Sequence, residues 1–239
     1  MLGHSHAVSG ALGWLAFAPV TSSIVGVHLS VGQMAAGTLA CAGAALLPDL
    51  DHPQATIAHF LGPVSQLLAK GVNIVAGGHR QATHSFAFVA LVGLGTQGLM
   101  MAFGVQAALW TMFIMTALAL RGLGLVPPGK RSSITNGLSV GVMAFAITYF
   151  VSKYVHGGFG FLPLAVALGC LFHIGGDCCT PERCPIFWPC KKRFGVGFIS
   201  HTGNALEVKV LTPLMGLAVL GLLYTTFIAP LLNSTLVGS

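Results

Sequence analysis

Apolar stretches close to the length of a membrane-spanning helix recur along the whole 239-residue chain. A helix of about 20 residues crosses the hydrocarbon core of a bilayer. Only 7% of the residues are charged, against roughly a quarter in a soluble domain. The sequence therefore predicts an all-α fold, a polytopic bundle of transmembrane helices that forms a single integral membrane domain over residues 1–239.

About seven spans are expected, together with one interfacial helix. Segment 57–75 mixes polar and apolar residues, which suits an amphipathic interfacial or re-entrant helix better than a span. Pro19 and the serines after it interrupt the first span, which is either one kinked helix or a shorter helix followed by a loop. Residues 127–131 form a basic turn. The expected spans are 6–27, 31–47, 84–103, 105–126, 134–155, 161–177 and 206–232.

Seven spans place ten of the eleven lysines and arginines on one side of the membrane, leaving only Lys153 on the other. Short loops rich in Lys and Arg face the cytoplasm. The chain is therefore predicted to have a cytoplasmic N-terminus and an external C-terminus. The ten residues are Lys70, Arg80, Arg121, Lys130, Arg131, Arg183, Lys191, Lys192, Arg193 and Lys209.

Most of the few carboxylates stand beside histidines. His173 and Asp177 are four residues apart on an expected helix, so they share one face and suit two ligands of one metal. The alternative is a His–Asp pair that only packs helices, although ionisable groups in membranes are costly and usually functional. Asp49 and Asp51 lie in a rigid turn, where two close carboxylates repel unless a cation or a proton separates them.

Further candidates fall on the same predicted face. His79 lies in a loop and His84 in the first turn of the third span, while Arg80 between them either grips an anion or only sets topology. His6 begins the first span and is a candidate ligand. Three side chains are left open as additional members of the site: His4, His52 and Glu207.

Mixed imidazole and carboxylate ligands suit zinc, manganese or iron, and argue against a calcium cage. The number of candidate ligands favours two ions, which can activate a bridging water for hydrolysis. Disulfides are improbable on a cytoplasmic face. The spacing of four further cysteines matches no familiar zinc pattern, so they are interpreted as loop residues: Cys178, Cys179, Cys184 and Cys190.

Ordered motifs in this chain resemble the YdjM-like inner-membrane proteins, a family described as metal-dependent hydrolases. They are Leu-Pro-Asp-Leu-Asp-His-Pro (47–53), Gly-His-Arg-x-x-Thr-His-Ser (78–85), His-x-x-x-Asp-x-x-Thr-Pro (173–181), Trp-Pro-Cys-x-x-Arg-Phe (188–194) and Gly-Asn-x-Leu-Glu (203–207). Relative to shorter members, segment 105–156 is expected to be an inserted helical hairpin, and the Cys178-Cys179 pair departs from the pattern.

The resemblance implies a bacterial or phage-encoded inner-membrane protein. Some members are described as binding the repressor of the DNA-damage response, which implies a cytoplasmic protein partner. A distant likeness to zinc-dependent phospholipase C and single-strand nucleases suggests phosphoester substrates by analogy. The metal ligands that the resemblance implies are His6, Asp49, Asp51, His79, His84, His173 and Asp177.

The leading hypothesis is a metal-dependent hydrolase that acts on a phosphoester of a membrane lipid or lipid-linked substrate at the cytoplasmic face. Asp49 or Asp51 would take a proton and Arg80 would hold the phosphoryl group. No direct nucleic-acid partner is expected, because the basic residues are confined to loops. The alternatives are a transporter or metal carrier that uses the same cluster, and a regulatory membrane scaffold with a structural metal.

Overall fold

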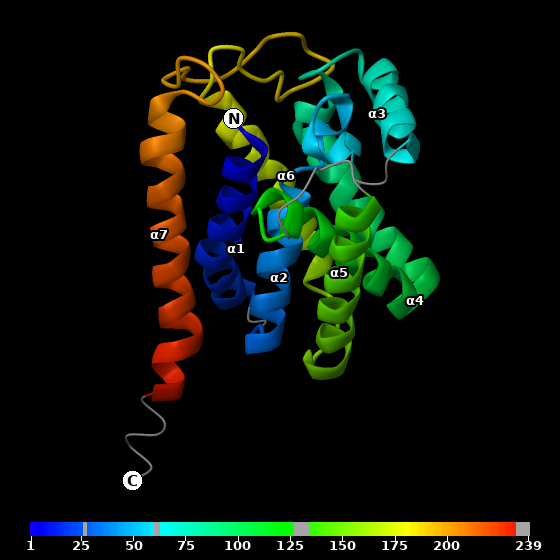
Figure 1. Ribbon diagram of the computed structural model, residues 1–239, viewed down its shortest axis with the longest axis vertical. Coiled ribbons are helices and arrows are strands. Elements are labelled where there is room, and N and C mark those ends of the chain that lie inside the picture. Colours follow the sequence, from blue (N-terminus) through cyan, green and yellow to red (C-terminus); the bar gives the residue numbers. More distant parts are fainter. Residues whose placement is uncertain (26–27, 60–62, 127–133, 233–239) are drawn as a thin grey trace.

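The computed structural model describes residues 1–25, 28–59, 63–126 and 134–232, and these residues contain helices but no β-strand beyond an isolated bridge between Cys184 and Phe194. The α-helices are α1 (Gly3–Val25), α2 (Val31–Ala44), α3 (Pro63–Ala76), α4 (Phe86–Gly122), α5 (Ile134–Tyr154), α6 (Leu162–Cys178) and α7 (Thr212–Leu223) (Figure 1). The expected all-α fold is confirmed.

Helices α2 and α6 form the centre of the bundle, where α1 and α4 pack against them (Figure 1). Small residues permit the close approach, as is common between membrane helices. A Cβ added at Gly43 of α2 would lie only 1.9 Å from the main-chain oxygen of Met115 in α4. The core also contains Trp14 of α1, whose indole donates a hydrogen bond to the carbonyl of Met34. Interhelical distances in this core are therefore set by glycines.

Helix α4 spans both the third and the fourth predicted segments. Its helical geometry breaks at Gly104 (φ 58°, ψ −139°), a conformation that glycine adopts readily, and the break falls between the two predicted spans. Gly93 in the first arm approaches Ala167 of α6, whereas Gly122 at the end of the second arm approaches Leu46, just beyond α2. The chain thus folds back at Gly104, and residue 122 returns to the end of the bundle at which Phe86 begins.

Among the described residues, four helices are long and apolar enough to cross a membrane: Val31–Asp51, Phe86–Gly122, Asn136–Tyr154 and Glu207–Leu232. Helix α6 is apolar but has only 17 residues. Helix α1 continues through Pro19 to Val25, which decides between the two readings of the first segment. The predicted basic turn, 127–131, lies outside the described residues.

Segment 57–75 forms the short 3₁₀ turn η2 (Thr56–His59) and, from Pro63, helix α3, which contacts the turns around the site. Proline fits the first helical turn, where its missing N–H costs nothing. At the other end of the chain, α7 continues the π-helical turn η4 (Glu207–Leu211) and leads into η5 (Tyr224–Ile228). Helix α7 stands at the edge of the bundle beside α1 (Figure 1).

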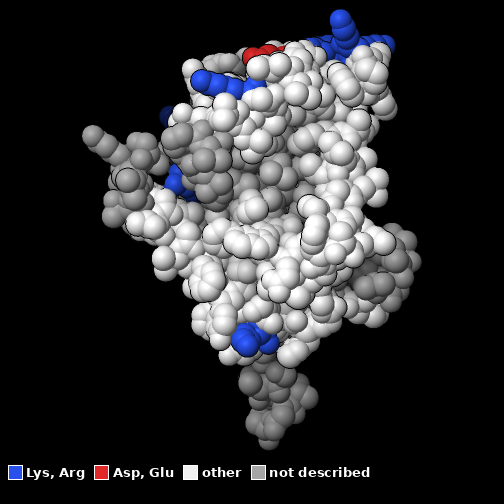
Figure 2. Space-filling model, turned by 90° about the vertical axis from the view of Figure 1, so that its right-hand side faces the viewer, with Lys and Arg blue, Asp and Glu red and all other residues white. Residues whose placement is uncertain are grey.

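An irregular loop between α6 and η4 crosses the end of the bundle at which the N-terminus lies (Figure 1). On the face that Figure 2 shows, most Lys and Arg side chains gather at this end. Such a distribution agrees with the predicted clustering of basic residues. The cytoplasmic placement of this end stays a prediction.

Candidate metal centre

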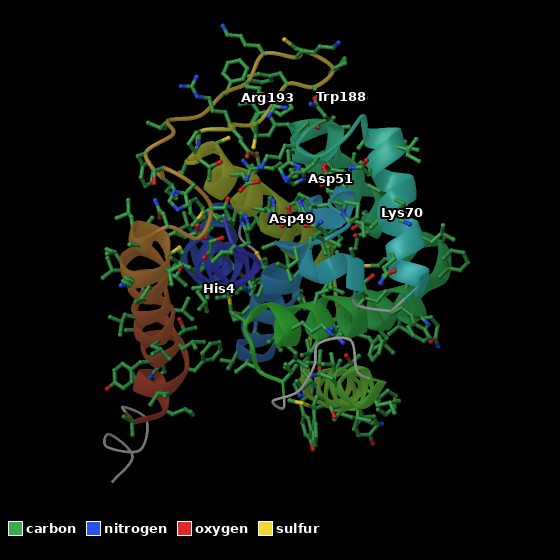
Figure 3. The ribbon with its side chains drawn as sticks, turned by 45° about the horizontal axis from the view of Figure 1, so that its top comes forward. His4, Asp49, Asp51, Lys70, Trp188 and Arg193 are labelled. Carbon is green, nitrogen blue, oxygen red and sulfur yellow. The ribbon has the colours of Figure 1, made fainter. Side chains whose placement is uncertain are left out.

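Three short turns and the last turns of α6 bring the chemistry-bearing residues together. The 3₁₀ turn η1 (Pro48–Asp51) follows α2 and carries Asp49 and Asp51. A second 3₁₀ turn, η3 (Ala82–His84), precedes α4. Figure 3 shows the two aspartates inside the molecule, below the loop that carries Trp188 and Arg193. The predicted clusters, far apart in the sequence, therefore meet at one end of the bundle.

Two imidazoles face each other at the centre of this cluster. The Nε2 atoms of His84 and His173 lie 3.2 Å apart, and both side chains are fully buried. His173 Nδ1 lies 2.7 Å from the carbonyl oxygen of Ala45. Because a carbonyl oxygen can only accept, Nδ1 carries a proton, and the Nε2 side of the ring faces His84.

The Nδ1 atom of His84 is also held by neighbouring groups, on the side of the ring away from the cluster. Its Nδ1 lies 3.0 Å from the hydroxyl of Thr83 and 3.5 Å from Asp51 Oδ2, and its Nε2 points to the cluster. Burial disfavours the imidazolium, but the adjacent carboxylates of Asp177 and Asp51 outweigh burial and raise the pKa of His84 to about 9. The carboxylates around His84 thus favour a positive charge at this position.

Two carboxylates complete a group of four. Asp177 Oδ2 lies 3.3 Å from His84 Nε2 and 3.5 Å from His173 Nε2, and Asp49 Oδ1 lies 3.6 Å from the latter. One ligating atom from each of the four residues falls within 4.8 Å of the others. Asp177 Oδ2 is buried and lacks a hydrogen-bond partner. A buried carboxylate oxygen without a hydrogen-bond partner beside two imidazole nitrogens fits a divalent cation such as zinc, manganese or iron.

Asp51 occupies a different position from the other aspartates. Its Oδ1 lies 2.7 Å from His79 Nδ1, and its Oδ2 accepts hydrogen bonds from the backbone N–H of Arg80 and the hydroxyl of Thr83. A carboxylate that binds the ring nitrogen of a histidine opposite its metal-binding nitrogen fixes the orientation of the ring. Asp49, Asp51 and His79 also form a second group close enough to hold an ion. Asp49 belongs to both groups, an arrangement compatible with the expected pair of ions.

His6 lies beside the central group but outside it. Its ring stacks on His173 with centroids 3.7 Å apart, and its Nε2 lies 3.3 Å from Asp177 Oδ1. Both ring nitrogens are buried without a hydrogen-bond partner. Its role as a ligand stays a prediction.

Arg80 closes the cluster on the side of Asp177. Its backbone adopts a left-handed conformation (φ 55°), and its Nη2 lies 2.9 Å from Asp177 Oδ1. Its Nη1 donates to Thr180 Oγ1 and lies 3.1 Å from Glu182. The buried guanidinium thus neutralises one oxygen of Asp177 and leaves the other directed at the histidines.

A cavity of about 670 Å³ opens over the cluster. Of the predicted residues, Asp49, His79 and Arg80 line it. Arg121 also lines the cavity, although the sequence predicted for it only a role in membrane topology. The one indication in the sequence was the position of this arginine at the end of an apolar segment. Two histidines left open, His4 and His52, also line the cavity. Its wall contains two guanidinium groups, Arg80 and Arg121, and two carboxylates, Asp49 and Glu182.

The family model of the YdjM inner membrane protein matches residues 1–124 and 136–235. The chain belongs to the YdjM inner membrane protein family. Together with its long apolar helices, this membership identifies a membrane protein. No curated protein and no solved structure matches the chain. The inserted hairpin at 105–156 stays a prediction.

In this YdjM-family protein, Glu207 belongs to neither group of described residues that could hold an ion. Its buried carboxylate accepts hydrogen bonds from the backbone N–H groups of Leu2 and Gly203, so it fastens the start of the chain to η4. Asn204 accepts the backbone N–H of Glu207 and caps this turn. Within the part of the chain that the structure describes, no cysteine belongs to a group that could share an ion.

Proposed function

We propose that this YdjM-family protein is a metal-dependent hydrolase that cleaves a phosphoester of a membrane lipid or lipid-linked substrate. The supporting observation is the facing pair of Nε2 atoms, His84 and His173, with Asp49 and Asp177 beside them. This cluster borders a cavity with arginines in its wall. Ligands of that type at a solvent-accessible cavity are typical of catalytic sites.

Four residues would hold the principal ion: Asp49, His84, His173 and Asp177. When bound, a divalent cation supplies a Lewis acid that polarises a phosphoryl oxygen and lowers the pKa of a water molecule. Asp51 and Thr83 hold His84 from behind, and Ala45 holds His173. These contacts keep both rings turned toward the ion position.

The remaining residues act on the substrate. Arg80 and Arg121 in the cavity wall would hold the phosphoryl group and its developing charge. Of the two aspartates expected to take a proton, Asp49 fits better, because it lines the cavity and its side chain is 18% exposed. Asp51 is fully buried, and both of its oxygens already accept hydrogen bonds or contact His79.

The location of the cluster favours an interfacial enzyme over a transporter. Transport sites lie near the bilayer midplane. Here the ligands come from η1 and η3, which follow or precede long helices, and from the C-terminal half of α6. The cavity therefore lies at the end of the helical bundle and away from its middle.

The function is tested with detergent-purified protein, zinc or manganese, and phosphatidic acid or an isoprenoid phosphate, with release of phosphate as the readout. We expect hydrolysis by the native protein. Arg121→Gln should raise KM roughly tenfold, the loss of one charged hydrogen bond, and leave metal content unchanged. Lys153→Gln is the matched control, since Lys153 lies in the last turn of α5 and is not among the cavity residues. Absence of product with every metal would refute the proposed substrate class.

A further inference from the structure

An apolar groove of about 790 Å³ runs between α3 and the first turns of α4. Its walls include Leu68, Val72 and Val75 from α3 and Phe88 and Leu91 from α4, and Trp188 of the long loop lines it as well. Several of these side chains are strongly exposed: Val75 is 86% and Leu91 67% exposed. Apolar surface of this extent needs an apolar partner.

The groove is continuous with the membrane-facing surface of α4. Helix α4 is one of the four long apolar helices, and in its first arm large apolar side chains such as Leu94 and Leu99 are exposed beyond the groove. In a protein of the inner membrane this surface contacts hydrocarbon. A lipid chain can therefore enter the groove from the bilayer without crossing water.

The groove and the metal centre share one segment, 78–85. His79 and Arg80 in this segment line the cavity over the cluster, whereas Ala82 and Thr83 line the groove. The hydroxyl of Thr83 donates to Asp51, which lies in the cluster. Only one residue, Gln81, thus separates the cavity wall from the groove wall along the chain.

Helix α3 is fixed relative to the cluster, so the groove has a defined position. Asn73 of α3 donates a hydrogen bond of 2.6 Å to the carbonyl of Asp51, and the carbonyl of Asn73 accepts the N–H of Gly78. These two bonds join the groove-forming helix to η1 and to the start of segment 78–85. A molecule in the groove therefore lies at a set distance from the ligands.

We propose that the groove binds one hydrocarbon chain of an anionic phospholipid whose phosphate head enters the cavity over the metal centre. Arg80 and Arg121 receive the phosphate, and the apolar side chains of α3 and α4 receive the chain. The proposal rests on the proposed function, because it names the substrate class of the same site. The proposed occupant is a membrane lipid; selective labelling of the groove by a lipid would exclude a protein segment as the occupant.

The test uses the full chain in phosphatidylcholine nanodiscs that contain phosphatidic acid with a diazirine on one acyl chain. Photolabelled peptides are mapped by mass spectrometry. Gly71→Phe places a ring in the groove, where an added Cβ meets no atom within 4 Å. Gly95→Phe is the matched control: this glycine of α4 also has open space around it and does not line the groove. Size-exclusion profiles show whether both variants fold.

We expect the native protein to be labelled on segment 67–91, and Gly71→Phe to lower that labelling about tenfold, as exclusion of about two methylene groups from an apolar groove predicts. Gly95→Phe should leave it unchanged. Equal labelling in all three proteins would show ordinary boundary lipid and would overturn the proposal that the groove binds a lipid chain.

Hydrolysis of the same phosphatidic acid separates the two proposals. If Gly71→Phe hydrolyses it with unchanged KM, the groove is refuted and the enzyme stands. If the groove is labelled selectively and no phosphate is released, the lipid site stands and the proposed function falls.

Discussion

At the scale of single residues, the three aspartates of the site differ in what their oxygens touch. Asp177 directs one buried oxygen at two imidazoles and gives the other to Arg80. Asp49 lines the cavity, whereas Asp51 holds His79 and the turn around Thr83. The sequence predicted all three as ligands, because it showed their closeness to histidines but not the direction of each oxygen.

Replacing Asp51 by Asn tests its role as the residue that orients the histidines. The amide lacks the charge that holds His79 and His84, so zinc affinity should fall by about 10- to 100-fold, the usual effect of losing such a partner. Competition with a fluorescent chelator measures the affinity. His201→Gln is the control, since the exposed imidazole of His201 lies 3.2 Å from the hydroxyl of Ser200 and is in neither candidate ligand group. An unchanged affinity in Asp51→Asn would contradict this role.

At the scale of elements, α4 shows how one glycine positions the site. The break at Gly104 returns the second arm to the end of the bundle where η3 lies, and Arg121 thereby reaches the cavity. The sequence allowed the two arms to be predicted, because an apolar stretch of this length exceeds a single span. The contribution of Arg121 could not be predicted, since it depends on how the arms pack against α2 and α6.

Gly104→Ala should destabilise the protein, because a Cβ is strained at φ 58° and ψ −139°, a conformation open essentially to glycine. We expect a loss of about 1–3 kcal/mol in the free energy of unfolding, seen as a lower Tm in detergent. Gly98→Ala is the matched change in the same helix. It lies in helical geometry with open space, so the better helix propensity of alanine should leave Tm equal or higher. If the Tm of Gly104→Ala were equal to or higher than that of Gly98→Ala, the predicted backbone strain of alanine at position 104 would be refuted.

At the scale of the whole molecule, composition and periodicity were sufficient to predict a helical membrane protein, and each expected segment overlaps an observed helix. The number of spans stays a prediction. The convergence of the His and Asp clusters also followed from the order of the spans, since their carriers all lie at helix ends. The apolar groove could not be predicted, because it depends on the hydrogen bond from Asn73 that fixes α3 beside α4. The orientation across the membrane stays a prediction.

The most direct test of the central claim is the metal content of detergent-purified protein by elemental analysis, compared with His84→Gln and with His201→Gln as the control. We predict about two zinc or manganese ions per chain in the native protein and the control, and a loss of metal in His84→Gln with an unchanged helical circular dichroism spectrum. A native protein that holds no divalent metal after reconstitution with zinc, manganese or iron would contradict the account. The histidines and aspartates would then form a protonated network that only packs the helices.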